Sequence, residues 1–301
     1  MKPLCIAAIA NQAYQEYIPL YLYFVLRAYP QYELIVYFDG TMHPEIAACV
    51  DLVGDMGRFR IKPIPQTYDT ASPQTIKALR WLLVDEEFYD YDNVYIGDID
   101  MFIVPEETPL HELHVRHSRE IGLPYSNRVR TGQQKLTGLH FVRTREYYER
   151  VLPTIRKYHE PVLSGSLRIN NEQLLYRMME ESVGLPQKVG NFVSFHGIHA
   201  RAFCASHDLA LQRSRDDFVF HRHFEPYAEK FVEATSAERF TDIRRALARI
   251  AYPSRTLEQH RLAGPGVLRQ IEVILSLCGA LDEERRAAGQ RPDRPGNRPA
   301  E

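Results

Sequence analysis

The N-terminal third of the chain alternates between short apolar runs and longer segments with apolar residues at helical spacing. Leu4–Ala10 is a continuous apolar run that ends at Asn11, which is typical of a strand buried on both faces of a parallel sheet. The strands expected here are Leu4–Ala10, Glu33–Phe38, Phe59–Ile64 and Asn93–Gly97, and the helices are Glu16–Ala28, Pro44–Val53 and Pro73–Phe88. This alternation predicts an α/β fold with a mostly parallel sheet flanked by helices.

Beyond Val104 the pattern is looser. It predicts strands at Glu120–Pro124, Gly138–Val142 and Val189–His196, and helices at Arg145–Tyr158 and Asn171–Glu181. From about residue 226 the sequence is amphipathic and helical, with a capping-box pattern at Thr235–Glu238 and a second helix through Val267–Cys278. Pro, Arg, Gly and Asn dominate Gly289–Glu301, which indicates a disordered tail. We therefore expect a large domain over residues 1–225, a helical C-terminal extension over 226–285 and a tail over 286–301.

The composition limits which partners and which cellular compartment we expect for this chain. Lys and Arg number 37 against 39 Asp and Glu, so the chain has no overall basic footprint and no nucleic-acid partner is expected. The four cysteines form no CxxC pair, which favours free thiols in a reducing compartment. No export signal is visible, and the longest apolar run, Tyr17–Leu26, is about half as long as a membrane span. We expect a cytoplasmic protein, and peripheral attachment to the inner face of a membrane stays open.

Two acids within one apolar segment are the strongest chemical signal. Asp98 and Asp100 stand in the run Val94–Val104, at the carboxyl end of an expected strand, where open α/β sheets bind ligands. Buried carboxylates are costly unless they are paired or bind a cation. Two of them suit Mg²⁺ or Mn²⁺, which also takes substrate phosphates as ligands. The pair therefore predicts a metal site that neutralises a diphosphate leaving group.

Three other interpretations of this pair fit less well. A solvated turn does not explain the apolar residues on both sides of the acids. A dehalogenase-type phosphatase would carry Thr or Val at the position of Phe102 and would place its acids near the N-terminus. A nucleotidyltransferase would need a glycine-rich basic loop after the first strand, whereas this chain has Asn11-Gln12-Ala13 there.

Further motifs accompany the acids in a characteristic order over about residues 4–205. They are Asn11 and Tyr14 after the first strand, Lys77 and Arg80 on a helix ahead of Asp98 and Asp100, the segment Leu136–Phe141, and Asn170-Asn171-Glu172-Gln173 followed by His196-Gly197-Ile198-His199. This order resembles the GT-A-fold nucleotide-sugar glycosyltransferases of the retaining glycogenin/lipopolysaccharide galactosyltransferase type. The resemblance implies metal-dependent transfer of a glucose- or galactose-type hexose from a UDP-sugar to a glycan or glycolipid acceptor, as in bacterial surface polysaccharide synthesis.

The resemblance also implies roles for individual residues. The ligands of Mn²⁺ or Mg²⁺ would be Asp98, Asp100 and either His199 or His196. The donor would be bound by Asn11, Tyr14, Lys77, Arg80, Asp98, Gly138, His140 and Arg201, and Asp39, at the end of a strand, is a further candidate for the base or ribose. The catalytic residues would be Glu172 and Asn171, at the reacting sugar, and Arg80, which would share the charge that develops on the leaving UDP.

Departures from the family pattern leave alternatives open. The late motif lacks the usual His-x-x-Gly followed by Lys, so either histidine is a candidate ligand, and Arg201, Lys77 or Arg80 would replace the lysine. Glu172 stands where the family usually carries Asp, so an inverting enzyme with Glu172 as general base is the first alternative. A non-catalytic nucleotide-sugar-binding or scaffold protein is the second. The C-terminal helices are candidates for contact with a membrane or a partner protein.

Overall fold

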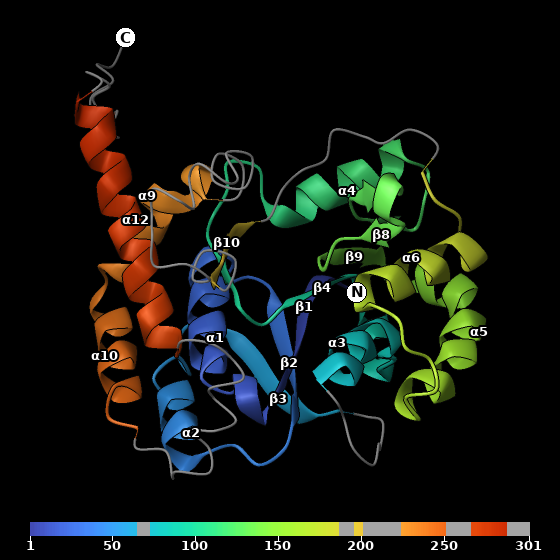
Figure 1. Ribbon diagram of the computed structural model, residues 1–301, viewed down its shortest axis with the longest axis horizontal. Helices are drawn as coiled ribbons and strands as arrows, with labels where there is room; N and C mark the ends of the chain where they lie inside the picture. The colour runs from blue at the N-terminus through green and yellow to red at the C-terminus, as the bar shows by residue number, and fades with distance from the viewer. Residues whose placement is uncertain (65–72, 187–195, 201–223, 251–265, 288–301) are drawn as a thin grey trace.

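The computed structural model describes residues 1–64, 73–186, 196–200, 224–250 and 266–287. A six-stranded sheet forms its centre, with strand order β3-β2-β1-β4-β9-β6 (Figure 1). The strands are β1 (Lys2–Asn11), β2 (Glu33–Asp39), β3 (Arg58–Pro63), β4 (Tyr91–Asp98), β6 (Tyr125–Ser126) and β9 (His140–Arg143). β1 pairs in parallel with both β2 and β4, and β2 pairs in parallel with β3, whereas β9 runs antiparallel to β4 and β6. The expected α/β fold with a mostly parallel sheet is confirmed.

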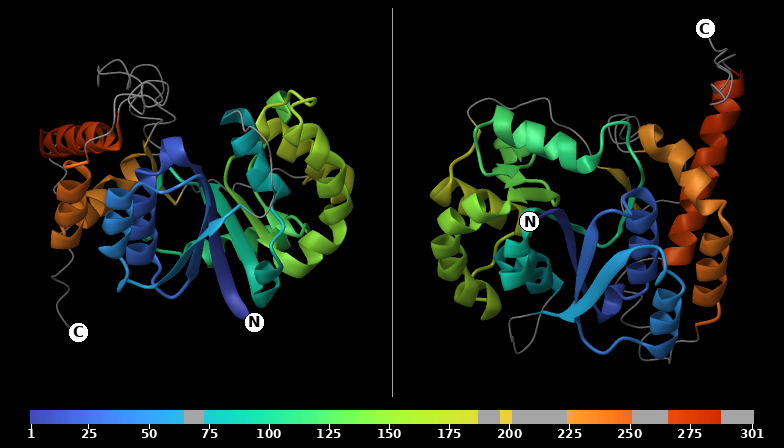
Figure 2. Two further views of the ribbon diagram at one scale, coloured as in Figure 1. Left: turned by 90° about the horizontal axis from the view of Figure 1, so that it is seen from below. Right: turned by 180° about the vertical axis from the view of Figure 1, so that it is seen from behind.

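Helices cover both faces of this sheet, as the edge-on view of Figure 2 shows. They are α1 (Tyr17–Ala28), α2 (Pro44–Asp51), α3 (Pro73–Leu82), α5 (Thr144–Leu163) and α6 (Asn171–Ser182). Alternate residues of β1 belong to two separate cores: Ile6 and Ala8 pack with α1 and α2, whereas Cys5 and Ala7 pack with α3, α5 and α6. A strand buried on both faces needs the continuous apolar run that its sequence has.

Two small two-stranded sheets extend this framework beside the carboxyl ends of the strands. β5 (Met101–Ile103), which follows β4 closely, pairs antiparallel with β10 (Gly197–His199). β7 (Val129–Arg130) pairs antiparallel with β8 (Lys135–Leu136). The first of these sheets brings a late segment of the chain next to the acids at the end of β4.

The C-terminal helices pack on the core of α1. They are α9 (Glu225–Thr235), α10 (Glu238–Leu247) and α12 (Val267–Ala287). Phe231 of α9 stacks on Phe24 of α1 with ring centroids 5.3 Å apart, and the Tyr17 hydroxyl donates to Gln270 Oε1 at 2.7 Å. Among the helices that the structure describes, none combines the length and apolar character needed to cross a membrane. The expected domain boundary near residue 225 stays a prediction.

One expected strand is wrong. Glu120, placed at the start of a strand over Glu120–Pro124, is the last residue of helix α4 (Leu110–Glu120), and the next strand is the short β6. The reason is that α4 buries polar side chains, His114, His117 and Ser118, together with Leu110. Apolar periodicity cannot reveal a helix whose buried face consists mainly of histidine and serine.

Smaller differences concern helix ends. The helix expected over Pro73–Phe88 ends at Leu82, and a separate 3-10 helix follows at Glu86–Asp90, with the Asp85 side chain accepting from the Glu87 amide. The capping box at Thr235–Glu238 does not form: Ala237 is the N-cap of α10 without a side-chain hydrogen bond. The Thr235 and Ser236 hydroxyls donate instead to carbonyls at the end of α9.

Some expectations fall outside the described residues. These are most of the strand at Val189–His196, the tail over Gly289–Glu301, and the side chains of Arg201 and Cys204. The cysteines Cys5, Cys49 and Cys278 are buried free thiols.

Candidate functional site

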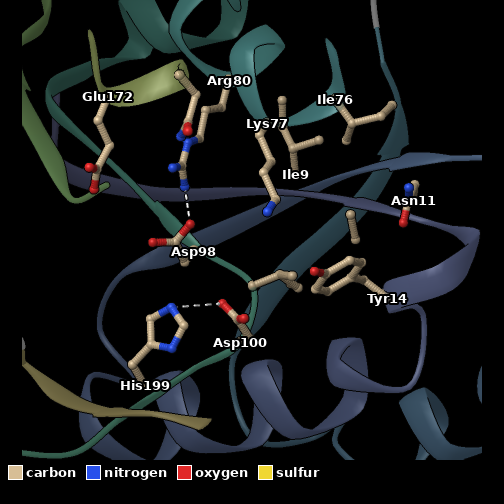
Figure 3. A pocket seen from close by; sticks show the side chains of 13 residues that line it. Ile9, Asn11, Tyr14, Ile76, Lys77, Arg80, Asp98, Asp100, Glu172 and His199 are labelled. Atoms are coloured by element: carbon tan, nitrogen blue, oxygen red, sulfur yellow. Dashed lines mark hydrogen bonds and ion pairs between the residues drawn. The ribbon is translucent and has the colours of Figure 1, made fainter. Parts of the chain in front are cut away.

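A pocket of about 480 Å³ opens where β1 and β4 end (Figure 3). It lies at the carboxyl edge of the parallel sheet, where open α/β folds bind ligands. Its lining residues come from β1 and the following turn, α3, the end of β4, the start of α6 and β10: Ile9, Ala10, Asn11, Tyr14, Ile76, Lys77, Arg80, Asp98, Ile99, Asp100, Asn171, Glu172 and His199. The structure thus brings together residues from five separate parts of the chain.

Asp98 forms an ion pair with Arg80 on one side of the pocket (Figure 3). The Arg80 side chain is almost fully buried, and its guanidinium lies over the Trp81 ring, 4.2 Å from the centroid. Burial against an aromatic ring fixes the cation in place, and Arg suits such a position because its charge is weakly hydrated. The Arg80 guanidinium, paired with Asp98, is therefore held in one position at the end of β4.

Gly138 lets the backbone after β8 approach this ion pair closely. A Cβ atom at this position would lie 2.5 Å from Asp98 Oδ2 and 3.0 Å from Arg80 Nη2. Any larger residue would therefore displace the carboxylate or the guanidinium. Gly138, expected to bind the donor, therefore lies against the two charged groups and does not itself line the pocket.

Asp100 and His199 form a second polar pair across the pocket (Figure 3). His199 Nε2 lies 3.5 Å from Asp100 Oδ1, and about one third of the His199 side chain is exposed, at 34%. The backbone holds the two residues together, since the Ala200 amide donates to the Asp100 carbonyl at 2.9 Å and His199 pairs with Met101 between β10 and β5. A carboxylate and an imidazole therefore converge from chain segments far apart in sequence.

The other candidate histidine does not reach the pocket. His196 is fully buried, its Nδ1 contacts Glu106, and its Nε2 lies 2.8 Å from Nε2 of His114. Both ring nitrogens therefore have protein partners away from Asp98 and Asp100. Of the two histidines left open by the sequence, the structure places only His199 beside the acids.

Glu172 and Asn171 line the pocket from the N-terminus of α6. The Asn170 side chain caps this helix by accepting from the Glu172 amide at 2.9 Å, so Asn171 and Glu172 occupy its first turn. The partial positive charge of a helix N-terminus favours a carboxylate there. Glu172 Oε2 also lies 3.6 Å from Arg130 Nη1, which neutralises part of its charge.

The remaining part of the pocket is formed by Asn11, Tyr14 and Lys77. Asn11 ends β1, and its side-chain oxygen is buried without a hydrogen-bond partner among the described residues. Tyr14 follows in a short 3-10 helix, and the amine of Lys77 points into the pocket from α3 (Figure 3). An orphaned acceptor, an aromatic ring and an ammonium group therefore share one end of the pocket.

Besides Gly138, two further candidates for donor binding lie outside the lining. Asp39 ends β2 next to Asn11 in the sheet register but does not line the pocket. His140 is fully buried behind the pocket, within 3.2 Å of the Asn127 amide nitrogen and packed against Trp81. Burial lowers the pKa of His140 to about 3, so its ring is neutral. This placement does not support the expected contact between His140 and a sugar.

Sequence reasoning missed several residues around the site. Arg130, which faces Glu172, lies in the β7–β8 hairpin, and Trp81 supports Arg80 from the same helix. Glu106 holds His196 from the segment after β5. Arg130 and Glu106 could not be recognised in the sequence, because their partners are distant along the chain. Glu172 lies 42 positions from Arg130, and His196 lies 90 positions from Glu106.

The donors at this site suit a divalent cation in type. In the part of the chain that the structure describes, no group of three or more His, Cys, Asp or Glu side chains is arranged to hold a metal ion. Asp100 and His199 nevertheless offer a carboxylate and an imidazole side by side, a combination that suits Mn²⁺. The Asp98 carboxylate faces the same pocket but is held by Arg80.

No protein-family model and no curated protein matches this sequence. Solved structures are similar at low identity. A galactosyltransferase, LgtC, in complex with donor and acceptor sugar analogues, is 16% identical with a TM-score of 0.40, over 85% of this chain and 99% of that one. The glycosyltransferase GlyE of Streptococcus pneumoniae TIGR4 is 10% identical with a TM-score of 0.44, over 99% of this chain and 66% of that one. The bifunctional glycosyltransferase WbbM is 10% identical with a TM-score of 0.47, over 86% of this chain and 52% of that one, so this chain matches about half of WbbM.

Proposed function

We propose that this protein is a metal-dependent GT-A-fold glycosyltransferase that moves a hexose from a UDP-sugar to a glycan or glycolipid acceptor, with retention at the anomeric carbon. The observation that carries the proposal is the pocket itself. Two carboxylates and an imidazole, Asp98, Asp100 and His199, face the buried cation Arg80 at the carboxyl edge of a parallel sheet. A charged diphosphate linked to an uncharged sugar needs such a set of groups.

The nucleoside end of the donor would lie against Asn11 and Tyr14. The Asn11 oxygen is an acceptor without a partner among the described residues, and a base or ribose donor group would satisfy it. The Tyr14 ring offers a face for stacking on the base. Lys77, whose amine points into the pocket, would meet the phosphates between the nucleoside and the sugar.

Asp100 and His199, together with Asp98, would hold Mn²⁺ or Mg²⁺ at this site, and phosphate oxygens of the donor would complete the ligand set. A bound divalent cation would neutralise charge on the diphosphate and make UDP a better leaving group. Arg80 would contribute in the same direction, because a fixed guanidinium beside the diphosphate would stabilise the charge that develops as UDP departs. Asp98 keeps that guanidinium in position.

The sugar would lie between the Asp98–Arg80 pair and the N-terminus of α6. In the reaction the bond from the anomeric carbon to the phosphate oxygen would break, and a bond from that carbon to the acceptor oxygen would form. The proton of the acceptor hydroxyl would pass to the phosphate oxygen of the leaving UDP. For retention, the acceptor hydroxyl attacks from the face that UDP leaves, while Glu172 and the Asn171 amide hold the sugar. The cytoplasmic location, the role in bacterial surface polysaccharide synthesis and the docking of the C-terminal helices are parts of the same proposal.

UDP release from a panel of UDP-sugars tests this function. We expect release in Mn²⁺ that one sugar dominates, that EDTA removes, and that Asp100→Ala abolishes. Asp242→Ala is a matched control, because Asp242 lies on α10, does not line the pocket, and forms an ion pair with nearby Arg245 at 2.9 Å. Binding of UDP-sugar without release would instead favour a non-catalytic nucleotide-sugar-binding protein. If the folded protein neither releases UDP nor binds any UDP-sugar, the transferase and the nucleotide-sugar-binding protein are both refuted.

A further inference from the structure

A row of hydrogen-bonded side chains runs beside the pocket without belonging to it. Glu106 contacts Nδ1 of His196, and Nε2 of His196 lies 2.8 Å from Nε2 of His114. His114 Nδ1 and His117 Nδ1 each lie 2.8 Å from the Ser126 hydroxyl. We name this set, Glu106, His196, His114, Ser126 and His117, the Glu–His relay. Its histidines and serine are at most 4% exposed.

The contacts of the relay agree with the following direction of hydrogen bonding. A carboxylate only accepts, so His196 Nδ1–H donates to Glu106 and leaves its Nε2 to accept from His114 Nε2–H. His114 Nδ1 then accepts from the Ser126 hydroxyl, which in turn accepts from His117 Nδ1–H. His114 and His117 are neutral in this pattern. Burial agrees with it, since it holds the pKa of His114 well below its ordinary value and lowers the pKa of His117.

His196 connects the relay to the backbone segment that carries His199. His196 has a φ of 60°, a left-handed conformation that few residues other than glycine adopt. Its carbonyl accepts from the Val104 amide at 2.9 Å, and β10 begins with the next residue. The β10–β5 ladder then runs to the pairing of His199 with Met101. The ring of His196 therefore fixes the point at which β10 enters its ladder.

The register of this ladder decides whether His199 faces the pocket. Successive side chains of a strand point to opposite faces, so a slip of one residue would turn His199 away from Asp100. Gly197 shows how closely β10 lies against β5, because a Cβ there would fall 2.0 Å from the Phe102 carbonyl oxygen. The Tyr227 hydroxyl, 3.4 Å from the other Glu106 oxygen, ties the relay to α9 as well.

We infer that the Glu–His relay sets the position of His199 beside Asp100, so that Glu106, His196 and His114 are positioning residues for the metal and its diphosphate. This inference rests on the proposed function for its consequence in catalysis. Its structural part, the fixing of β10 by His196, rests on the hydrogen bonds and the backbone conformation alone. Partners behind a ligating side chain commonly change metal affinity by about 10- to 100-fold.

The experiment compares four variants. Glu106→Ala and His196→Gly break the relay, and glycine leaves the left-handed backbone of residue 196 unstrained. Glu106→Gln keeps an acceptor for His196 Nδ1–H and should behave like the wild type. His111→Ala is the matched control, because His111 lies one turn before His114 on α4 but contacts Asn93, at 3.0 Å, outside the relay.

Two readouts separate positioning from general stability. We expect Glu106→Ala and His196→Gly to raise the half-saturating Mn²⁺ concentration for UDP release by about 10- to 100-fold, with kcat at saturating Mn²⁺ close to that of the wild type. NMR amide exchange should show faster exchange at Ile198 and Ala200 in both variants, with the sheet amides of β1 unchanged. Glu106→Gln and His111→Ala should change neither readout.

Unchanged Mn²⁺ dependence and unchanged exchange in Glu106→Ala and His196→Gly would overturn the inference. Equal losses in the His111→Ala control would overturn it too, since they would indicate general destabilisation. A wild type without Mn²⁺-dependent release would refute the proposed function alone. The amide exchange of β10 would then still decide whether His196 fixes this strand.

Discussion

Gly138→Ala isolates the contact between the backbone after β8 and the charged pair at the end of β4. The added methyl would lie 2.5 Å from Asp98 Oδ2, whereas ordinary van der Waals contact begins near 3.4 Å. The carboxylate must therefore move by about 0.9 Å, and the Arg80 guanidinium, 3.0 Å away, must give way as well. Both groups are ends of side chains, so the fold can absorb the change.

This geometry predicts a large effect on activity and a small one on stability. A misplacement of about 1 Å in a catalytic arrangement commonly costs about 10²-fold in rate, so kcat for UDP release should fall by about that factor. The unfolding free energy should change by less than about 1 kcal/mol, because no buried apolar contact is lost. Steady-state UDP release and urea unfolding measure the two quantities.

Gly132→Ala is the control for this prediction. A Cβ at Gly132 meets no atom within 4 Å, and the residue lies in the nearby 3-10 helix at Thr131–Gln133. Wild-type kcat in Gly138→Ala would refute the claim that the Asp98–Arg80 geometry matters for the reaction. If the free energy of unfolding falls by as much as the activation free energy of UDP release rises, the glycine serves the fold instead.

Two further predictions concern stability. Phe231→Ala should lower the unfolding free energy, measured by urea denaturation, by about 3–5 kcal/mol, because the ring is fully buried and stacks on both Phe24 and Phe102. A cost below about 1 kcal/mol would contradict a shared core between α9 and α1. His140 has a pKa lowered to about 3 by burial, so below the ordinary value of about 6.5 the unfolded chain binds a proton that the folded protein does not, and stability must fall as the pH falls. His140→Gln, which keeps a polar partner for Asn127, should reduce the slope of unfolding free energy against pH by about 1.4 kcal/mol per pH unit between about pH 6 and 4, and an unchanged slope would show that His140 does not titrate in this way.

Much of the fold was predictable because its signal is local. The parallel strands β1, β2 and β4 each contain an apolar run a few residues long, and the flanking helices α1, α3 and α5 carry their own periodicity. Helix α4 was not predictable in this way, because its buried face carries His114 and His117, whose partners Ser126 and His196 come from other elements. A buried polar face of a helix can be recognised only when its hydrogen-bond partners are known.

The residues of the candidate site also differ in how far the sequence reveals them. Asp98 and Asp100 stand out in the sequence, since two acids interrupt an apolar run. The choice between His196 and His199 could not be made from the sequence, because it depends on the pairing of β10 with β5 across almost a hundred positions of chain. Only the ladder determines which histidine faces the acids and which one enters the core.

The central place of β1 has a consequence for how the protein folds. Ile9 of β1 lies in register with Asp98 of β4, which is 89 positions later, while β2 pairs with β1 after a much shorter connection. Closing the longer loop costs more chain entropy, and contacts between distant parts of a chain slow folding. The pocket is built on the ends of these two strands, so it can form only when this distant pairing is complete. A folding intermediate that contains β1, β2 and α1 would therefore be native-like on one side of the sheet and still lack the pocket.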